Sequence, residues 1–302
     1  MRITITGATG LIGPQLVKAL KNRGDEVTVL SRNPEKAKAA LGVEAIAWAD
    51  PAGEPAPAAA FEGRDVVVHL AGEPVAQRWN AAVKERIRSS REEGTRHLVA
   101  GIAAAQERPK VLVSSSAVGY YGPRGDERIP ESTAPGGDFL AGVCVAWERE
   151  AQKAVDHGLR VALVRTGIVL SEEGGALATM LTPFKLGAGG PLAGGRQYMP
   201  WIHLDDLVGI YLAAIDGEGW SGPVNASAPE PVTNKEFSKA LGRVLHRPAF
   251  APVPKLAVKI LYGEMADVVA TGARAVPERT LELGYSFLHA ELEPALRDAL
   301  GR

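Results

Sequence analysis

Short apolar runs alternate with segments of helical periodicity through residues 1–165. Several runs are almost continuously apolar, which is typical of parallel strands that helices cover on both faces. The predicted strands are Ile3–Thr6, Glu26–Leu30, Glu44–Ala47, Asp65–Leu70, Val111–Ser115 and Arg160–Arg165. The predicted helices are Leu11–Arg23, Pro34–Leu41, Asn80–Ala105 and Phe139–His157. This alternation predicts an α/β fold built on a doubly wound parallel sheet.

The pattern changes after Arg165. Gly187–Gly195 carries five glycines, and helical periodicity returns in three later segments. Those predicted helices are Asn234–Leu245, Lys255–Tyr262 and Ala290–Leu300. We expect residues 1–165 to form a nucleotide-binding domain and residues 166–302 a smaller C-terminal substrate lobe. The sequence is also compatible with a chain that returns to the sheet after this boundary.

The turn after the first strand carries glycines at a regular spacing. Gly7, Gly10 and Gly13 follow a G-x-x-G-x-x-G pattern between the strand and an apolar-periodic helix. Glycine leaves the backbone open to a ligand, and the N-terminus of a helix offers free N–H groups to phosphate. The turn therefore predicts a dinucleotide site. Thr9, Leu11 and Ile12 belong to the same turn and are included in that site.

The end of the second strand bears on which dinucleotide is bound. Ser31 and Arg32 stand where an NAD site usually places a carboxylate that holds the ribose 2′-OH. A hydroxyl beside a guanidinium attracts a 2′-phosphate, so this pair favours NADP(H) over NAD. The alternative is that Arg32 simply begins a solvated loop. Lys36 is a weaker candidate for the same role. At the end of the fourth strand, small residues leading to Gly72 allow close backbone contact with the cofactor.

Composition narrows the class of protein. The 302 residues carry a net charge of −1, which gives no electrostatic reason to expect nucleic acid or an acidic membrane as partner. One cysteine excludes an intramolecular disulfide, and six scattered histidines lack metal-ligand spacing, so we expect no metal. The chain opens on a strand and has no apolar run of about 20 residues. We therefore expect no signal peptide, no membrane span and a cytoplasmic location.

Several longer motifs resemble one protein family. TGATGLIG, DVVVHLAG, VSSSAVGYYG and WIHLDDL follow the order typical of extended short-chain dehydrogenase/reductases. GDFLAGVCVAWE, RTGIVLSEEGGAL, PFKLGAGGPLAGGRQYMPWIHLDDL and VPERTLELGYSF resemble an atypical branch named "epimerase family protein". The resemblance covers nearly the whole chain and implies a Rossmann fold with NADP(H) as cofactor. It further implies that the cofactor site includes Leu70, Ala71, Glu85 and Arg91. Ser114, in the serine run that ends the fifth strand, is a further candidate for this site.

The catalytic residues of the wider family are only partly present. Ser116 aligns with the family's catalytic Ser or Thr, whereas the Tyr and Lys positions fall on Leu140 and Cys144. Neither residue can move a proton as a Tyr–Lys pair does. Tyr121 is a candidate replacement, with packing as the alternative for it and for its neighbour Tyr120.

Several other positions offer polar groups for a site. His203 is either an acid/base or a structural residue, and we favour the structural role. Arg165 either pairs with a carboxylate or lines the cleft. Asp205 or Asp206 is expected to cap the following helix. In the glycine-rich loop, Arg196 and Gln197 are candidate donors to a substrate.

Three functions are compatible with these features. The first is an NADP(H)-dependent oxidoreductase or epimerase-like enzyme acting on a small carbonyl, hydroxyl or nucleotide-linked substrate. The second is a non-catalytic NADPH sensor or partner-binding module that has lost the Tyr–Lys pair. The third, weaker, is a sugar-nucleotide binder without redox chemistry. A homodimer and a monomer are both compatible with the sequence.

Overall fold

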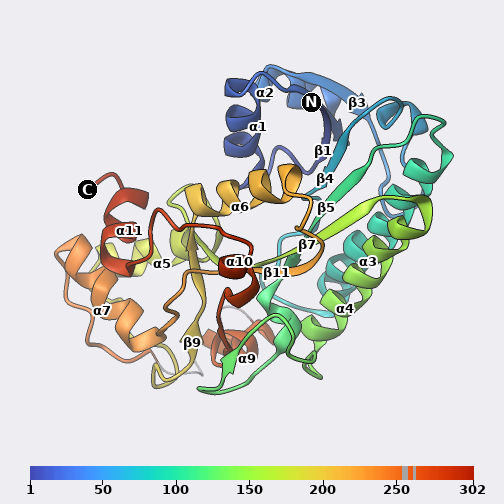
Figure 1. Ribbon diagram of the computed structural model, residues 1–302. Coiled ribbons are helices and arrows are strands. Elements are labelled where there is room, and N and C mark those ends of the chain that lie inside the picture. Colours follow the sequence, from blue (N-terminus) through green and yellow to red (C-terminus); the bar gives the residue numbers. More distant parts are fainter. Residues whose placement is uncertain (254–257, 261–262) are drawn as a thin grey trace.

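The computed structural model describes residues 1–253, 258–260 and 263–302. In this part of the chain, seven strands form one parallel sheet in the order β3-β2-β1-β4-β5-β7-β11 (Figure 1). Their bounds are β1 (Arg2–Thr6), β2 (Glu26–Ser31), β3 (Glu44–Ala47), β4 (Val66–His69), β5 (Val111–Ala117), β7 (Arg160–Thr166) and β11 (Gly222–Ala226). The order reverses between β1 and β4, and ligands of open α/β sheets bind at such a point.

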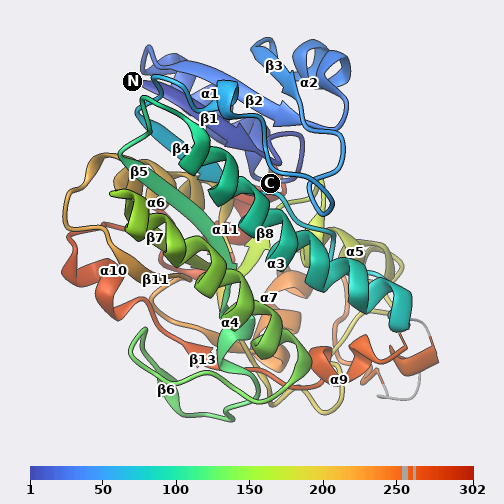
Figure 2. The same cartoon turned by 90° about the vertical axis from the view of Figure 1, so that its right-hand side faces the viewer.

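Helices cover both faces of the sheet, as predicted. On one face lie α3 (Ala81–Ala104) and α4 (Phe139–Gln152), which run side by side in front of the strands in Figure 2. On the other face lie α1 (Gly13–Asn22) and α6 (Leu204–Asp216). The helix α2 (Pro34–Leu41) follows β2 and packs against β2 and β3.

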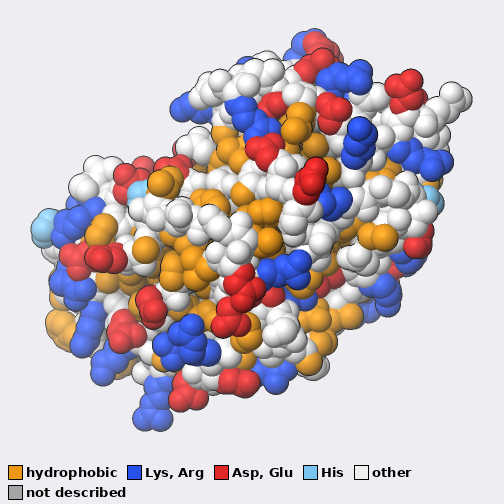
Figure 3. Space-filling view, viewed as in Figure 1, with side chains coloured by type: hydrophobic (Ala, Val, Ile, Leu, Met, Phe, Trp, Pro, Cys, Tyr) orange, Lys and Arg blue, Asp and Glu red, His pale blue; other side chains and the backbone are white. Residues whose placement is uncertain are grey.

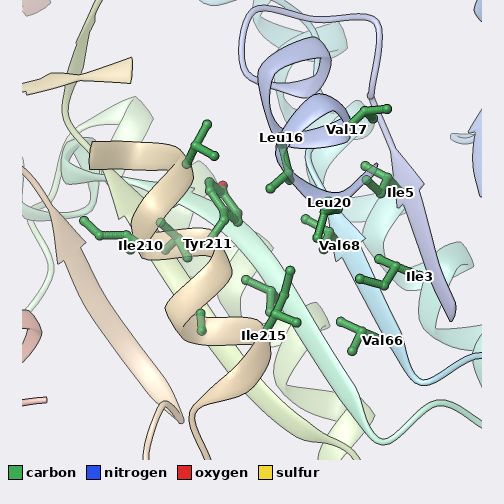
Figure 4. Packing of buried hydrophobic residues seen from close by; sticks show 14 of the residues in the cluster. Ile3, Ile5, Leu16, Val17, Leu20, Val66, Val68, Ile210, Tyr211 and Ile215 are labelled. Atoms are coloured by element: carbon green, nitrogen blue, oxygen red, sulfur yellow. The ribbon is translucent and has the colours of Figure 1, made fainter. Parts of the chain in front are cut away.

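The main core fills the space between the sheet and the α1/α6 pair. Ile3 and Ile5 of β1 meet Leu16 and Leu20 of α1, and Ile215 of α6 packs in the same cluster (Figure 4). All five side chains are almost completely buried. Full burial of an aliphatic side chain stabilises the fold by about 1.5–3 kcal/mol, so these layers hold the carboxyl ends of the strands in fixed positions.

The remaining elements build the C-terminal lobe and its links to the sheet. They are β8 (Ile168–Leu170), α5 (Gly175–Lys185), β9 (Tyr198–Met199), β10 (Trp201–His203), β12 (Val232–Thr233), α7 (Asn234–Leu245), α9 (Met265–Val269), α10 (Glu278–Glu282) and α11 (Leu292–Ala299). The short strand β6 (Arg128–Ile129) pairs with β13 (Arg274–Ala275). The 3-10 turns among the described residues are η1 (Ala58–Ala60), η2 (Val118–Tyr121) and η3 (Lys153–His157).

The structure differs from the sequence prediction in several places. The first helix begins at Gly13 rather than Leu11, because Pro14 occupies the first turn of the helix, where proline is favoured. The helix predicted to end at His157 stops at Gln152 and continues as the 3-10 turn η3. Of the helix predicted over Lys255–Tyr262, residues 255–257 and 261–262 lie outside the described residues, and residues 258–260 between them are helical.

The chain does not leave the sheet at residue 166. Strand β11 pairs in parallel with β7, so a segment of the predicted lobe forms the edge strand of the nucleotide-binding sheet. Helix α6 also lies beyond residue 166 and contributes to the main core. None of the helices in the described residues is long and apolar enough to cross a membrane.

Candidate functional site

The glycine turn after β1 is shaped by close backbone contacts. Gly7 has a φ of +69°, and a Cβ at this position would lie 2.6 Å from the amide nitrogen of Ala71. A Cβ on Gly13 would overlap the carbonyl oxygen of Ala8, so glycine lets α1 pack close to the strand end. Gly10 N–H donates to the Gly7 carbonyl, 3.0 Å away. The first amide groups of α1 have no carbonyl partner within the helix and can face an anion.

A cavity of about 500 Å³ opens at this turn. It extends from the ends of β1 and β2 to the loop after β4, across the point where the strand order reverses. The cofactor residues predicted from sequence that line it are Gly7, Thr9, Gly10, Ser31, Arg32, Leu70, Ala71 and Gly72. The structure therefore brings together residues from three separate parts of the sequence. A volume of this size falls in the range of small-molecule and cofactor sites.

Arg32 is an unpartnered cation on the rim of this cavity. Its side chain is exposed and makes no hydrogen bond or ion pair within the described residues. Ser31 Oγ accepts a hydrogen bond from Asn33 N–H and lies 3.1 Å from the Asn33 carbonyl, which shapes the bend after β2. In this part of the cavity a guanidinium and a hydroxyl are adjacent, which is a combination suited to a phosphate group.

The opposite wall is formed by the backbone after β4. Thr6 Oγ1 accepts a hydrogen bond from Ala71 N–H, which fixes this loop against β1. A Cβ on Gly72 would lie 3.1 Å from the Arg91 guanidinium. Arg91 donates to the carbonyl of Glu73 and lies over the Trp147 ring at 5.0 Å. Arg91 thus supports the loop that lines the cavity, and it is not itself part of the lining.

Other predicted cofactor residues also lie outside the lining. They are Leu11, Ile12, Gly13, Glu85 and Ser114. Glu85 is exposed on α3, whereas its neighbour Arg86 lines the cavity together with Ser89 and Ser90. One residue along a helix turns the side chain by about 100°, so a shift by one position changes which residue faces the cavity. The spacing of Arg86 and Ser90, four apart on a helix face, could have indicated this side of α3.

Residues 48–52 after β3 form another part of the lining that the sequence analysis did not identify. Trp48 is nearly buried there, and its indole N–H donates to the Glu54 carbonyl. The segment from Ala49 to Ala60 is rich in Ala and Pro, a composition typical of a solvated loop. Composition gave no signal that the loop closes over the end of the sheet.

Ser116 belongs to a buried polar network rather than to the cavity. Its hydroxyl donates to Glu148 Oε1 at 2.6 Å, and the residue is 2% exposed. Glu148 also accepts two hydrogen bonds from Arg165, each 2.8 Å long. Burial alone would lower the pKa of Arg165, but the hydrogen bonds to Glu148 raise it overall. Of the two roles considered for Arg165, the structure supports pairing with a carboxylate.

Tyr121 lies in the same network. Its hydroxyl donates to Asn225 Oδ1 at 2.7 Å and accepts from Arg165 at 2.9 Å. The side chain is completely buried, and burial raises the pKa of Tyr121 to about 12 despite the nearby arginine. Cys144 is also buried, and burial raises the pKa of its thiol to about 12, as expected for a packed residue. Neither group lines the cavity.

The glycine-rich loop was predicted to offer hydrogen-bond donors to a substrate, and in the structure one of the two predicted donors is used within the protein. Gln197 donates its amide hydrogens to the carbonyls of Leu192 and Val269, so these donors hold the loop and do not face a substrate. Arg196 is exposed and makes no hydrogen bond or ion pair among the residues described. A Cβ on Gly190 would overlap the Ala251 carbonyl, so close backbone approach explains a glycine here.

His203 has the structural role that the sequence analysis favoured. Its Nδ1 accepts the Asp205 amide hydrogen at 3.2 Å and caps α6. The prediction that Asp205 or Asp206 is the cap was wrong by two or three residues. Asp206 instead accepts hydrogen bonds from the backbone of Leu288 and His289, far along the chain.

The sheet order, the glycine turn and the cavity at the reversal point define a protein with the Rossmann fold. The chain belongs to the NAD dependent epimerase/dehydratase family, whose model matches residues 3–225. A model described as a domain of unknown function, DUF1731, matches residues 253–299. The family resemblance inferred from the sequence motifs is confirmed.

Relatives with similar sequences carry the same general description. The chain is 40% identical to Epimerase family protein SDR39U1 of Bos taurus over 99% of this chain and 100% of that protein. It is 41% identical to the Epimerase family protein SDR39U1 homolog, chloroplastic, of Arabidopsis thaliana over 98% and 86% of the two chains. It is 36% identical to Epimerase family protein YfhF of Bacillus subtilis over 98% and 97%.

Solved structures show the same fold. The crystal structure of human epimerase family protein SDR39U1 (isoform2) with NADPH has a TM-score of 0.88 at 35% identity, covering 100% of this chain and 99% of that one. UDP-glucuronic acid 4-epimerase from Bacillus cereus has a TM-score of 0.79 at 16% identity, covering 100% and 99%. The second likeness concerns the fold alone.

Proposed function

We propose that this protein binds NADP(H) in the cavity at the ends of β1, β2 and β4 and acts as an oxidoreductase or epimerase-like enzyme. Its substrate is a small carbonyl, hydroxyl or nucleotide-linked compound. The observation that carries the proposal is the continuity of the glycine turn with the unpartnered Arg32 in one cavity. The human relative crystallised with NADPH supports the choice of cofactor. A cytoplasmic location stays a prediction, and the name of the Arabidopsis relative assigns that protein to the chloroplast.

The residues of the cavity fit the groups of this cofactor. Gly7 and Gly10 present backbone without side chains, and the N-terminus of α1 favours the diphosphate. Ser31 and Arg32 are placed to bind the 2′-phosphate, and the backbone of Ala71 borders the same cavity. When bound, NADP(H) would supply the hydride chemistry, while the protein supplies binding and orientation.

A second candidate function is a non-catalytic NADPH sensor. Three observations favour it: Ser116 donates to Glu148, Tyr121 is completely buried, and Leu140 and Cys144 occupy the positions of the usual Tyr–Lys pair. Ser116, Tyr121, Leu140 and Cys144 all lie outside the cavity lining. A catalytic role for Ser116 and Tyr121 therefore stays a prediction that requires movement of buried groups.

Arg32→Ala tests the cofactor assignment. A charged hydrogen-bond donor contributes about 1.5–3 kcal/mol, so we expect NADPH affinity to fall by about tenfold to a hundredfold. The affinity for NADH, which lacks the 2′-phosphate, should stay nearly unchanged. Titration calorimetry with both nucleotides measures the two effects.

Lys36→Ala is the matched control for this variant. Lys36 is an exposed cation four residues away and does not line the cavity. Its removal should leave NADPH affinity within about twofold, because an exposed charge outside the cavity lining is largely screened by solvent and salt. An Arg32→Ala protein that binds NADPH like the parent would refute the assignment of the 2′-phosphate to this residue.

NADPH oxidation across a panel of aldehydes, ketones and sugar nucleotides separates the two candidate functions. Turnover that needs bound NADPH supports the enzyme. Tight NADPH binding together with no turnover across the panel favours the sensor, because binding and chemistry are then uncoupled.

A further inference from the structure

Four side chains outside the cofactor cavity gather beside α11. They are His203 at the end of β10, Asp205 in the first turn of α6, His289 before α11 and Asp298 in its last turn. One potential ligand atom from each lies within 4.8 Å of the others. Their positions are spread over nearly a hundred residues, which explains why sequence spacing indicated no metal site.

The distances between these atoms suit a small divalent cation. His203 Nε2 lies 3.2 Å from an Asp298 carboxylate oxygen. An Asp205 oxygen lies 4.0 Å from His289 Nε2, and it lies 3.9 Å from Nδ1, the ring nitrogen of His203 that does not bind the ion. Ligands bound tetrahedrally at about 2.0–2.2 Å are separated by about 3.3–3.6 Å, so rotation of these side chains brings the set around one ion.

His203 supplies an independent indication of a ligand. The residue is 4% exposed, and its Nε2 is buried without a hydrogen-bond partner, because the contact with Asp298 lacks hydrogen-bond geometry. A buried polar atom without a partner costs about 1–3 kcal/mol, so such atoms call for an explanation. This nitrogen lies 3.2 Å from a carboxylate oxygen of Asp298, within the cluster.

The two histidine rings are held in a defined arrangement. They stack with centroids 3.7 Å apart and planes inclined by 28°. Asp206 holds the backbone beside the second ring by accepting hydrogen bonds from the amides of Leu288 and His289. Two imidazolium ions would repel at this distance, and the neutral form of imidazole is the one that binds metals. Stacked rings hold their nitrogen lone pairs in nearly parallel planes, so one ring must turn out of the stack for both histidines to bind one ion.

We propose that His203, Asp205, His289 and Asp298 form a binding site for a divalent transition metal of the Zn²⁺ class. Two imidazoles with two carboxylates match the preferences of Zn²⁺, whereas Mg²⁺ and Ca²⁺ prefer oxygen ligands throughout. The bound ion joins the N-terminus of α6 to the C-terminal helix α11. It therefore fixes the C-terminal segment on the rest of the molecule.

Metal binding requires one proton to move. In the metal-free protein His203 Nδ1 accepts the Asp205 amide hydrogen, so the neutral ring carries its proton on Nε2. Coordination at Nε2 releases this proton, and Nδ1 takes up a proton in exchange. The ring stays neutral, and the new Nδ1–H can no longer accept the Asp205 amide hydrogen, so metal binding breaks this cap hydrogen bond of α6.

The test uses the full chain without a polyhistidine tag. Added Co²⁺ should give the strong visible bands of a tetrahedral site, saturate at about one ion per chain and be displaced by Zn²⁺. His289→Ala and Asp298→Asn should each weaken Co²⁺ binding by at least about tenfold. Both positions tolerate change, since Asp298 is largely exposed and His289 lies at the surface edge of the cluster. Zn²⁺ should raise the melting temperature of the parent more than that of either variant.

The double variant Asp156→Asn/His157→Gln is the matched control. It removes an adjacent aspartate and histidine from η3, outside the cluster, and should bind Co²⁺ like the parent. Either of two results would overturn the proposal. One is that the parent protein gives only the weak spectrum of hydrated Co²⁺. The other is that the two cluster variants bind Co²⁺ as tightly as the parent does.

Discussion

At the scale of single residues, the ends of β5 and β7 are held by one buried ion pair. Arg165 and Ser116 face each other across these strands, and both contact Glu148 of α4. The Arg165 guanidinium also lies 3.5 Å from the centre of the Tyr120 ring. A buried charge is stable only when it is paired and hydrogen-bonded, so the pair is a structural requirement at this position.

Replacing Glu148 by Gln tests this requirement. The variant leaves the Arg165 charge buried without its carboxylate, and we expect the free energy of unfolding to fall by about 3 kcal/mol. Urea denaturation at neutral pH measures the change. Glu172→Gln is the control, because Glu172 is exposed and its substitution should change stability by less than about 0.5 kcal/mol. A loss below about 1 kcal/mol in Glu148→Gln would contradict this account of the pair.

His69 makes stability depend on pH. It is completely buried between the hydroxyls of Thr6 and Thr95, and burial, with the charge of Arg91, lowers the pKa of His69 to about 3. The unfolded chain has a pKa of about 6.5 at this histidine, so below that pH only the unfolded state gains the proton. The free energy of unfolding should therefore fall by up to about 1.4 kcal/mol per pH unit between about pH 6.5 and pH 3.

Urea denaturation at a series of pH values measures this slope. In His69→Gln the group that gains the proton is absent, so stability should fall less steeply with acidification. Burial also lowers the pKa of His203, and this contribution is common to both proteins. Equal slopes in the parent and the variant would show that His69 is not the titrating group.

At the scale of elements, α7 shows how local sequence determines a helix. Thr233 and Glu236 form a reciprocal cap: each side chain accepts a hydrogen bond from the backbone N–H of the other residue. Removing the hydroxyl in Thr233→Ala should lower the free energy of unfolding by about 1 kcal/mol. Thr233→Ser keeps the cap and should retain most of this stability in thermal unfolding experiments. Similar losses in both variants would mean that packing rather than capping holds the helix start.

The sequence predicted elements of this kind well, because their signals are local. The predicted bounds Asn234–Leu245 match α7, and the strands of the first half are correct to within one or two residues. Strand β11 was missed because it opens on Gly222 and Pro223, which disfavour a strand in isolation. It forms because its backbone pairs with β7, and this contact is invisible in local sequence.

In the candidate site, too, local features were predicted from the sequence and contacts between distant elements were not. Gly7, Arg32 and Ala71 were predicted because each follows directly from a strand end, where ligands of such sheets bind. The partners of Ser116 and Tyr121 were not predicted. They come from α4 and β11, so they depend on how distant elements pack and not on any motif.

At the scale of the whole molecule, the N-terminal elements and the C-terminal lobe lie on either side of a band of hydrophobic side chains across one face (Figure 3). The sheet supplies the cofactor cavity, and β11 and α6 return from the second half of the chain to complete the sheet and its core. The two halves are therefore connected through shared elements. A separated fragment of residues 1–165 would lack the edge strand and the helix that covers this face of the sheet.

A crystal structure of the protein grown with NADPH tests the central claim most directly. We expect the diphosphate at the turn from Gly7 to Gly13, the 2′-phosphate on Arg32 and the adenosine along the loop of Leu70 and Ala71. NADPH bound in a different part of the molecule, or a 2′-phosphate that does not contact Arg32, would contradict the account.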